Sequence, residues 1–314
     1  MAMPLTIRVR HDLWSCRIRQ TGLQENSRKS FAQYSYALKI GECSIPHPDK
    51  VEYGGEDAYF VSSLSCGVSD GVGGWQESGI NPAEYSQGLM DEAKRYFEEE
   101  TDIIDDSGSS VQDQTTLGAL TRAHQRTRKP GSATACILKI DSDSGALEAS
   151  NLGDSGFLVI RNGHVVLQTP VQEHFFDCPF QLGAAPEYVP ETDYPEDSNQ
   201  IKHQLQEGDV IVMATDGLWD NVSQQDIIQI VQSYREKEDV NDIAQALGSK
   251  AFTHSQDTAF ESPYALEARK AGLELSIWDK LSAATFTESG FKLGEITGGK
   301  MDDITVLVAS VVTI

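Results

Sequence analysis

The sequence has few cysteines and no long hydrophobic run. Its longest apolar stretches, such as residues 210–214, are the length of a strand and too short to cross a bilayer. Its five cysteines are widely spaced and form no Cys-x-x-Cys pair, which excludes a disulfide framework or a structural zinc site. We therefore expect a globular protein without a membrane span, in a reducing compartment.

Positive charge is also scarce. The chain has 25 Lys and Arg against 48 Asp and Glu, a net charge of −23. Duplex nucleic acid is bound mainly by cationic side chains that neutralise its phosphates, so nucleic acid is not an expected partner. An acidic protein can still bind phosphorylated substrates where bound cations supply the local positive charge.

The first thirty residues are the exception, because they are rich in arginine and poor in acids. Such a composition fits either a mitochondrial transit segment or a basic first strand at residues 5–9, and the residues leave both readings open. We expect residues 1–33 to be a separate segment and residues 34–314 to form a single domain.

Patterns of β-branched and aromatic residues predict strands at 58–62, 65–69, 134–140, 146–151, 157–161, 164–168, 209–214 and 304–312. Asn162-Gly163 between two apolar runs is a strong hairpin signal. Helix starts are predicted at Asn81-Pro82, at Ser223 and at Ser262-Pro263. Two polar stretches, 102–116 and 185–199, are predicted surface loops. Strands in hairpin order with helices in blocks predict an α+β fold with antiparallel sheets.

Acidic residues stand at the ends of these strands. Asp70, Asp154 and Asp216 each follow an apolar run at a tight turn, and two acidic pairs, Glu56-Asp57 and Asp302-Asp303, precede strands. Each Asp-Gly pair alone is usually only a turn. Together, carboxylates without His or Cys partners are hard oxygen ligands, suited to Mg²⁺ or Mn²⁺ rather than to zinc.

Six blocks now occur in one order along the chain, and together they resemble the metal-dependent serine/threonine phosphatases of the protein phosphatase 2C (PPM) type. The blocks are Gly55-Glu56-Asp57-Ala58, Asp70-Gly71-Val72-Gly73-Gly74-Trp75, Gly131 to Ala135, Leu152 to Gly156, Ala214 to Asn221 and Gly299 to Val306. The resemblance runs from about residue 34 to the C-terminus. The second block, together with residues 173–182 and Ser262-Pro263, looks like the mitochondrial branch of that family. The fold it implies is a sandwich of two antiparallel sheets flanked by helices, in four αββα layers.

The resemblance also implies which residues hold metal. Asp70 would bridge two Mn²⁺ or Mg²⁺ ions, and the carbonyl of Gly71 would serve the first ion, with Glu56 acting through water. Asp216 and Asp302 would hold the second ion. The same four carboxylates would carry catalysis.

Further acids have supporting roles by the same resemblance. Asp154 and Asp220 match positions linked to a third, looser ion or to outer water. Asp57 and Asp303 would orient the ligands, while a turn role for each stays open. Paired ions can generate a hydroxide that attacks phosphorus in line, so no phosphoenzyme is needed.

Two positions depart from the family pattern. Val72 stands where many members have a histidine that protonates the leaving group, and Glu52 stands where many have a phosphate-binding arginine. We expect metal-bound water to act as the proton donor, and Lys50 or Lys300 to contact phosphate as a point charge, although either could be an ordinary solvated lysine.

The sequence thus predicts hydrolysis of phosphoserine and phosphothreonine in protein substrates by a monomeric, mitochondrial matrix enzyme, with the cytoplasm as the alternative location. Two other functions stay open. One is a pseudophosphatase that keeps the fold as a partner-binding module, which the intact acidic residues disfavour. The other is hydrolysis of small phosphate esters.

Overall fold

A computed structural model describes residues 35–99, 114–184, 192–234, 239–274, 285–287, 290–292 and 296–314 of the chain. Residues Tyr34–Ile314 form one compact unit. No helix in these ranges is both long and apolar enough to span a bilayer.

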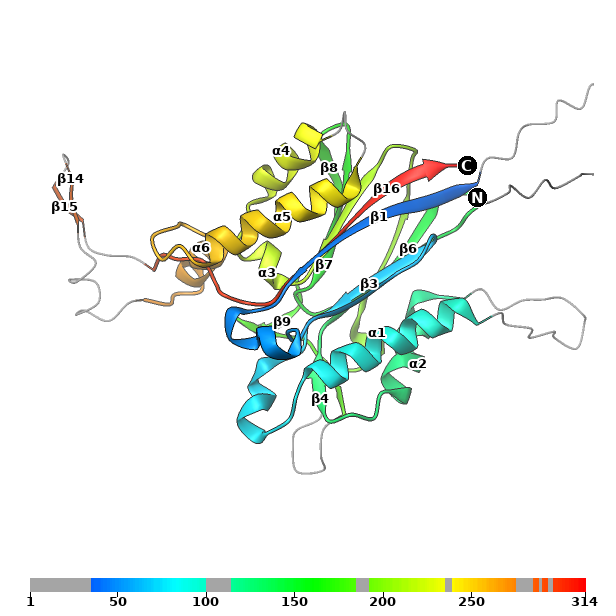
Figure 1. Ribbon diagram of the computed structural model, residues 1–314, viewed down its shortest axis with the longest axis horizontal. Helices are drawn as coiled ribbons and strands as arrows, with labels where there is room; N and C mark the ends of the chain where they lie inside the picture. The colour runs from blue at the N-terminus through cyan, green and yellow to red at the C-terminus, as the bar shows by residue number, and fades with distance from the viewer. Residues whose placement is uncertain are drawn as a thin grey trace, which may run out of the picture. The chain divides into compact units, whose positions relative to one another are not determined.

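Two five-stranded sheets form the centre of this unit (Figure 1). The first contains, in spatial order, β1 (Tyr36–Ile45), β16 (Ile304–Thr313), β13 (Val210–Ala214), β7 (Gly156–Arg161) and β8 (His164–Gln168). The second contains β12 (Asn199–Gln204), β6 (Ala146–Leu152), β5 (Ala135–Ile140), β3 (Ser65–Ser69) and β2 (Ala58–Val61). All neighbouring strands in both sheets are antiparallel.

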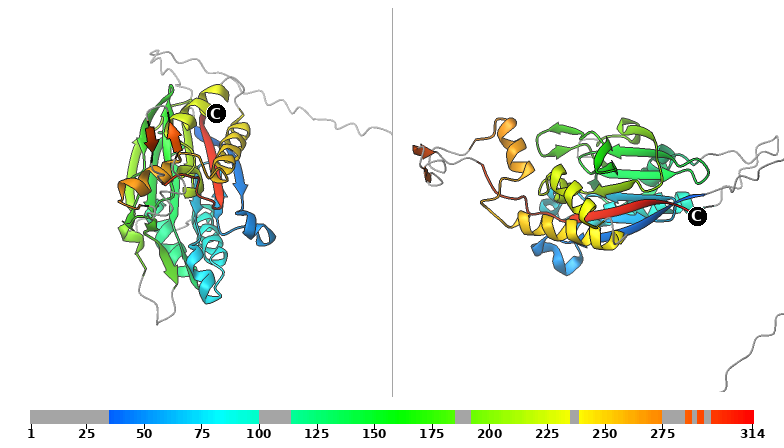
Figure 2. Two further views of the ribbon diagram at one scale, coloured as in Figure 1. Left: turned by 90° about the vertical axis from the view of Figure 1, so that its left-hand side faces the viewer. Right: turned by 90° about the horizontal axis from the view of Figure 1, so that it is seen from above.

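Helices cover the outer face of each sheet. Helices α4 (Gln224–Tyr234) and α5 (Val240–Ser255) pack on the first sheet, and α1 (Ala83–Glu98) and α2 (Thr116–Arg126) pack on the second. A separate apolar core, which includes Val68, Phe157, Met213 and Leu307, lies between the sheets. The result is the four-layer αββα arrangement, with the two helix pairs on opposite sides of the strands (Figures 1 and 2). The predicted fold class is confirmed.

Shorter elements complete the described part of the unit. The remaining helices are α3 (Asp216–Trp219), α6 (Pro263–Lys270) and the 3₁₀ turns Pro48–Tyr53, Gly73–Ser78 and Pro195–Asp197. The remaining strands are β4 (Gly131–Ala133), β9 (Glu173–Phe175), β10 (Cys178–Pro179), β11 (Leu182–Ala184), β14 (Thr285–Thr287) and β15 (Gly290–Lys292).

The predicted strands and helix starts are found within about two residues of their positions. The carboxamide of Asn81 accepts from Ala83 N, but Pro82 is the N-cap, one position later than predicted. The run at 134–140 forms β5, and the residues just before it form a separate strand, β4, which pairs with β11. The longer elements that were not predicted are strands β1 and β12 and helices α2 and α5. The short strands β4, β9, β10, β11, β14 and β15 and the short helix α3 were not predicted either. The suggested strand at 5–9 and most of the loop at 102–116 lie outside the described residues, as does the first half of the loop at 185–199.

Candidate metal centre

The strand-end acids lie at one end of the sandwich. Asp70 follows β3, Asp216 follows β13, and Asp302 precedes β16. Burial raises the pKa of Asp70, and the neighbouring carboxylates raise it further, led by Asp216 and followed by Asp57, Asp302 and Asp154. The structure therefore brings together the acids that the sequence placed at separate turns.

Asp57 connects the two sheets at this end. Thr215 at the end of β13 donates its hydroxyl to Asp57 Oδ2 at 2.8 Å, and the same hydroxyl accepts from Thr305 N at 3.1 Å. Asp57 directly precedes β2 of the second sheet, whereas Thr215 directly follows β13 and Thr305 lies in β16 of the first. This hydrogen-bonded chain fixes the separation of the two halves of the site.

The turn at Asp70 is held by Thr134. Its hydroxyl accepts from Asp70 N at 3.0 Å and lies 2.7 Å from Ser155 Oγ. Gly71 N donates to Glu56 O at 3.2 Å, and a Cβ atom on Gly71 would lie only 2.7 Å from that oxygen. Glycine is thus required here by the close approach of two backbones.

Asp303 orients the Glu56 side of the site. Its carboxylate accepts from His47 N at 2.7 Å and from Glu56 N at 2.9 Å. Lys50 Nζ lies 2.5 Å from Glu56 Oε2 and 3.1 Å from Asp303 Oδ2. Glu56 is fully buried, so the lysine supplies the positive charge that a buried carboxylate needs.

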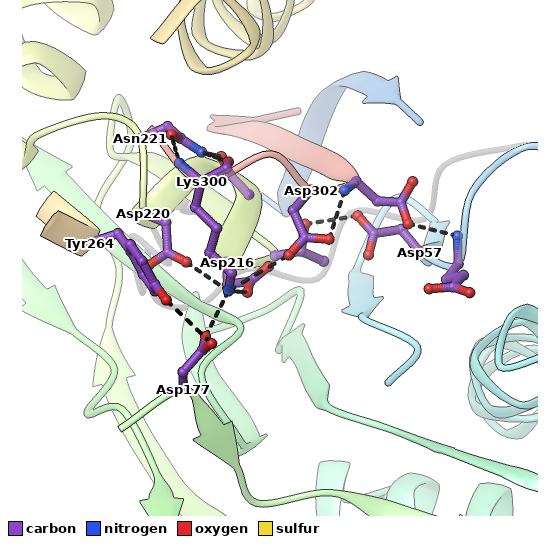
Figure 3. Close-up of polar contacts among 12 residues, drawn as sticks. Asp57, Asp177, Asp216, Asp220, Asn221, Tyr264, Lys300 and Asp302 are labelled. Atoms are coloured by element: carbon purple, nitrogen blue, oxygen red, sulfur yellow. Dashed lines mark hydrogen bonds and ion pairs between the residues drawn. The ribbon is translucent and has the colours of Figure 1, made fainter. Parts of the chain in front are cut away.

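Lys300 has the corresponding position on the other side (Figure 3). Its ammonium lies 2.6 Å from Asp216 Oδ2, 3.0 Å from Asp220 Oδ2 and 3.6 Å from Asp302 Oδ2. Both lysines that the sequence suggested as phosphate contacts are therefore paired with carboxylates.

Two residues at this side were missed by sequence reasoning. Asp177 Oδ1 lies 3.0 Å from Lys300 Nζ, and the Tyr264 ring lies beneath the same ammonium at 5.3 Å. Tyr264 OH also donates to Asp177 Oδ2 at 3.4 Å. Asp177 lies within residues 173–182 and Tyr264 directly follows Ser262-Pro263, the two segments that resemble the mitochondrial branch of the family. That resemblance was the one sequence feature that could have pointed to them.

Burial and neighbouring charges lower the pKa of one carboxyl group of the site and raise the pKa of several others. Burial favours protonation of Asp216, but the Lys300 ammonium holds its pKa below the ordinary value. Burial raises the pKa of Asp220 to about 8 and that of Asp302 to about 7, with Asp216 adding to both. The pKa values of Asp57 and Asp154 are also raised by burial and by neighbouring carboxylates.

These groups fit a divalent cation. Among the described side chains, Asp57 Oδ1, Asp154 Oδ1 and Asp216 Oδ1 are buried oxygens without a hydrogen-bond partner. Buried carboxylate oxygens need a compensating charge or donor, and Mg²⁺ and Mn²⁺ prefer oxygen ligands. Within the described ranges, no group of three or more His, Cys, Asp or Glu side chains has the arrangement of a metal site. A bound metal would therefore require some rearrangement around the lysines.

Comparison with known proteins is consistent with this site. The family model described as Stage II sporulation protein E (SpoIIE) matches residues 79–259. The Arabidopsis thaliana protein named "Probable protein phosphatase 2C 26" is 41% identical over 284 residues, covering 88% of this chain and 85% of the relative. The human "Protein phosphatase PTC7 homolog" is 35% identical over 271 residues, covering 82% and 79%.

Solved structures agree with the sequence relatives. The X-ray structure of the photosystem II phosphatase PBCP aligns with a TM-score of 0.72 at 37% identity, covering 87% of this chain and 98% of that one. The catalytic domain of the serine/threonine phosphatase PstP, solved with two manganese ions, shares the fold with a TM-score of 0.56 at 16% identity, covering 88% and 99%. The extent and identity of these matches show that the chain belongs to the protein phosphatase 2C family and is a protein serine/threonine phosphatase.

Proposed function

We propose that the acidic cluster binds Mn²⁺ or Mg²⁺ and that hydrolysis of phosphoserine and phosphothreonine depends on these ions. The observation that carries the proposal is the set of three unpartnered, buried carboxylate oxygens on Asp57, Asp154 and Asp216. The PstP relative was solved with two manganese ions, which supports the same chemistry in this fold.

The ligands we propose are Asp70, the Gly71 carbonyl, Asp216, Asp302 and Glu56, with Asp154 available to a third ion. Bound ions would activate water and neutralise phosphoryl oxygens. The chain itself positions these groups: Asp303 and Lys50 hold Glu56, and Thr215 holds Asp57. Asp220 lies within reach of Lys300, so we assign it to the outer ring of the site.

We propose that the substrate is a phosphoprotein, because a pocket of about 350 Å³ continues from the cluster. Its lining joins Asp154, Asp216 and Asp220 to the aromatic rings of Phe176 and Tyr264, whose centroids are 5.2 Å apart. An apolar wall next to the reacting group can contact a side chain that flanks the phosphorylated residue. A small phosphate ester has no such side chain.

Phe176→Ala should therefore separate protein substrates from small ones. We expect kcat/KM for a phosphothreonine peptide to fall roughly tenfold, since burying an aromatic side chain is worth ~1.5–3 kcal/mol, while p-nitrophenyl phosphate hydrolysis stays nearly unchanged. The matched control is Phe175→Ala, because Phe175 is 70% exposed and does not line the pocket. Equal losses on both substrates would contradict a peptide role. If kcat/KM falls for neither substrate and p-nitrophenyl phosphate is the better one, a small-molecule phosphatase would be favoured.

Metal binding should also release protons. Asp220 and Asp302, with pKa values of about 8 and 7, are largely or partly protonated at neutral pH and must lose those protons to bind or face cations. We expect the release of ~1 proton or more per chain near pH 7 and little release near pH 9. Mn²⁺ titration calorimetry in buffers of different ionisation enthalpy measures this number. A proton count that does not change with pH would contradict the assignment.

The location of the protein remains a proposal. We propose an organellar address on the basis of the arginine-rich first segment, with the mitochondrial matrix favoured by the branch-like motifs and by the PTC7 homologues at 34–35% identity. The similarity to a photosystem II phosphatase makes the chloroplast a rival. Import of a fusion of residues 1–33 into isolated mitochondria and chloroplasts would decide, and failure of both would favour the cytoplasm.

A further inference from the structure

Lys300 makes an unusually large number of ionic contacts for one side chain. An ammonium group has three N–H donors, yet four carboxylates lie within 3.6 Å of Nζ. Three of them are on the inner side: Asp216 and Asp302 are ligands of the metal centre proposed above, and Asp220 lies beside these ligands. The fourth, on Asp177, is on the outer side and is 42% exposed.

The backbone of Lys300 is fixed in place. The side chain of Asn221, which is fully buried, donates to Lys300 O at 2.8 Å and accepts from Lys300 N at 3.0 Å. A Cβ atom on the preceding Gly299 would lie 2.1 Å from His254 O, so the segment packs directly on the end of α5. Only the four-carbon side chain of Lys300 is therefore free to change position.

Two groups of partners surround the ammonium of that side chain. On the inner side, it lies near Asp216 Oδ2, Asp220 Oδ2 and Asp302 Oδ2. On the outer side, Asp177 and the Tyr264 ring offer an anion and a cation–π contact away from the inner carboxylates. Because Asp177 and Tyr264 already contact the ammonium, they can hold it when the inner contacts weaken.

A divalent cation and the inner ammonium need the same oxygens. Asp216 offers one unpartnered oxygen, Oδ1, but its second oxygen is taken by Lys300. Two cations a few ångströms apart also repel each other strongly. Full ligation by Asp216 and Asp302 therefore requires the ammonium to withdraw.

We propose that Lys300 is a displaceable counter-cation of the acidic cluster, which occupies the inner carboxylates until divalent ions bind and then moves outward to Asp177 and Tyr264. The inference rests on the proposed metal centre. It adds a competition between an internal cation and the ions, which keeps the cluster folded and ordered when metal is scarce and sets a threshold concentration for loading.

The test measures Mn²⁺ binding by titration calorimetry, and Tm in chelator, for the full chain and for Lys300→Met. We expect the variant to bind Mn²⁺ on the order of tenfold more tightly, because the competing charge is gone. We expect a lower Tm in chelator, because the inner carboxylates lose their counter-charge. Lys300→Gln is the second variant, should the methionine form fold poorly.

Removal of the outer carboxylate is expected to change Mn²⁺ affinity in the opposite direction to removal of the lysine. Asp177→Asn removes the anion that receives the displaced ammonium, so Mn²⁺ affinity should fall severalfold while Tm in chelator changes little. Lys129→Met is the matched control, because Lys129 pairs with Glu84 on the exposed surface of α1 and should alter neither measurement.

The outcomes are separable. Unchanged or weaker Mn²⁺ binding by both Lys300 variants, with normal binding by the wild type, overturns the competition and leaves the metal centre intact. Weaker inhibition by inorganic phosphate in place of tighter metal binding would identify Lys300 as a phosphate contact and would also overturn the proposal. Absence of Mn²⁺ binding in the wild type would overturn the proposed function itself.

Discussion

Asp216→Asn is expected to lower kcat/KM for a phosphothreonine peptide by about a thousandfold, or ~4 kcal/mol of transition-state stabilisation. The amide keeps the shape of the side chain but loses the negative charge that would hold a cation. Asp216 lies at the centre of the cluster, because it contacts Lys300 and is the carboxylate that most raises the pKa of both Asp70 and Asp302. Steady-state kinetics with saturating Mn²⁺ measure the loss.

The matched control lies at the other end of the same strand. Asp209 precedes β13, is 1% exposed and pairs with Arg161 at 2.7 Å, far from the acidic cluster in the strand. Asp209→Asn therefore also perturbs a buried, ion-paired aspartate, and we expect it to lower stability but to leave kcat/KM within about twofold. Similar losses of activity in both variants would indicate a general effect of destabilisation and would count against a catalytic role for Asp216.

Millimolar Mn²⁺ is expected to raise Tm by about 5 °C or more relative to protein in chelator. A ligand present at a hundred times its dissociation constant stabilises the folded state by ~2.7 kcal/mol, and each kcal/mol corresponds to ~2–4 °C in a domain of this size. The physical cause is the crowding of buried carboxylates, which repel one another until cations bind.

This stabilisation should depend on pH in a defined direction. The folded-state pKa values of Asp220 and Asp302, about 8 and 7, lie above those of unfolded aspartate. In chelator, the folded state therefore binds more protons than the unfolded state, and Tm should fall as pH rises from about 5 to about 8. The gain from Mn²⁺ should grow over the same interval. An Asp216→Asn variant whose Tm rises with Mn²⁺ as much as that of the wild type would contradict the site. A Mn²⁺-induced rise in Tm that stays constant from about pH 5 to about pH 8 would also contradict it.

The strands and the acidic residues could be predicted because their signals are local. An apolar run that ends in Asp-Gly or begins after Asp-Asp is legible without knowledge of its neighbours, as at β13 and β16. In an antiparallel pair, the end of one strand lies beside the start of its neighbour, as the end of β13 lies beside the start of β16. Which of these acids would share one site was implied by the family resemblance.

The missed elements have weaker local signals and depend on tertiary contacts. In β1, Gly41 interrupts the strand pattern, yet a Cβ atom there would lie 2.4 Å from Val240 C and Asn241 N at the start of α5. The glycine is thus explained by a helix about two hundred residues later in the chain. Propensity alone cannot indicate such a contact.

The same limit applies to the lysines and to Asn221. The sequence gives Asn221 no specific role, whereas the structure buries its amide against Lys300 and Gly217. Lys50 and Lys300 read as candidate phosphate contacts because both lie near acidic motifs. Their pairing with Glu56 and Asp216 depends on side-chain positions that no residue spacing reveals.

The most direct measurement of the central claim is hydrolysis of a phosphothreonine peptide by protein that has been stripped with chelator and then titrated with Mn²⁺. A divalent-cation centre built from Asp70, Asp216 and Asp302 predicts no turnover after stripping and full recovery as Mn²⁺ is added, with no recovery in Asp216→Asn. Turnover that survives exhaustive chelation would contradict it.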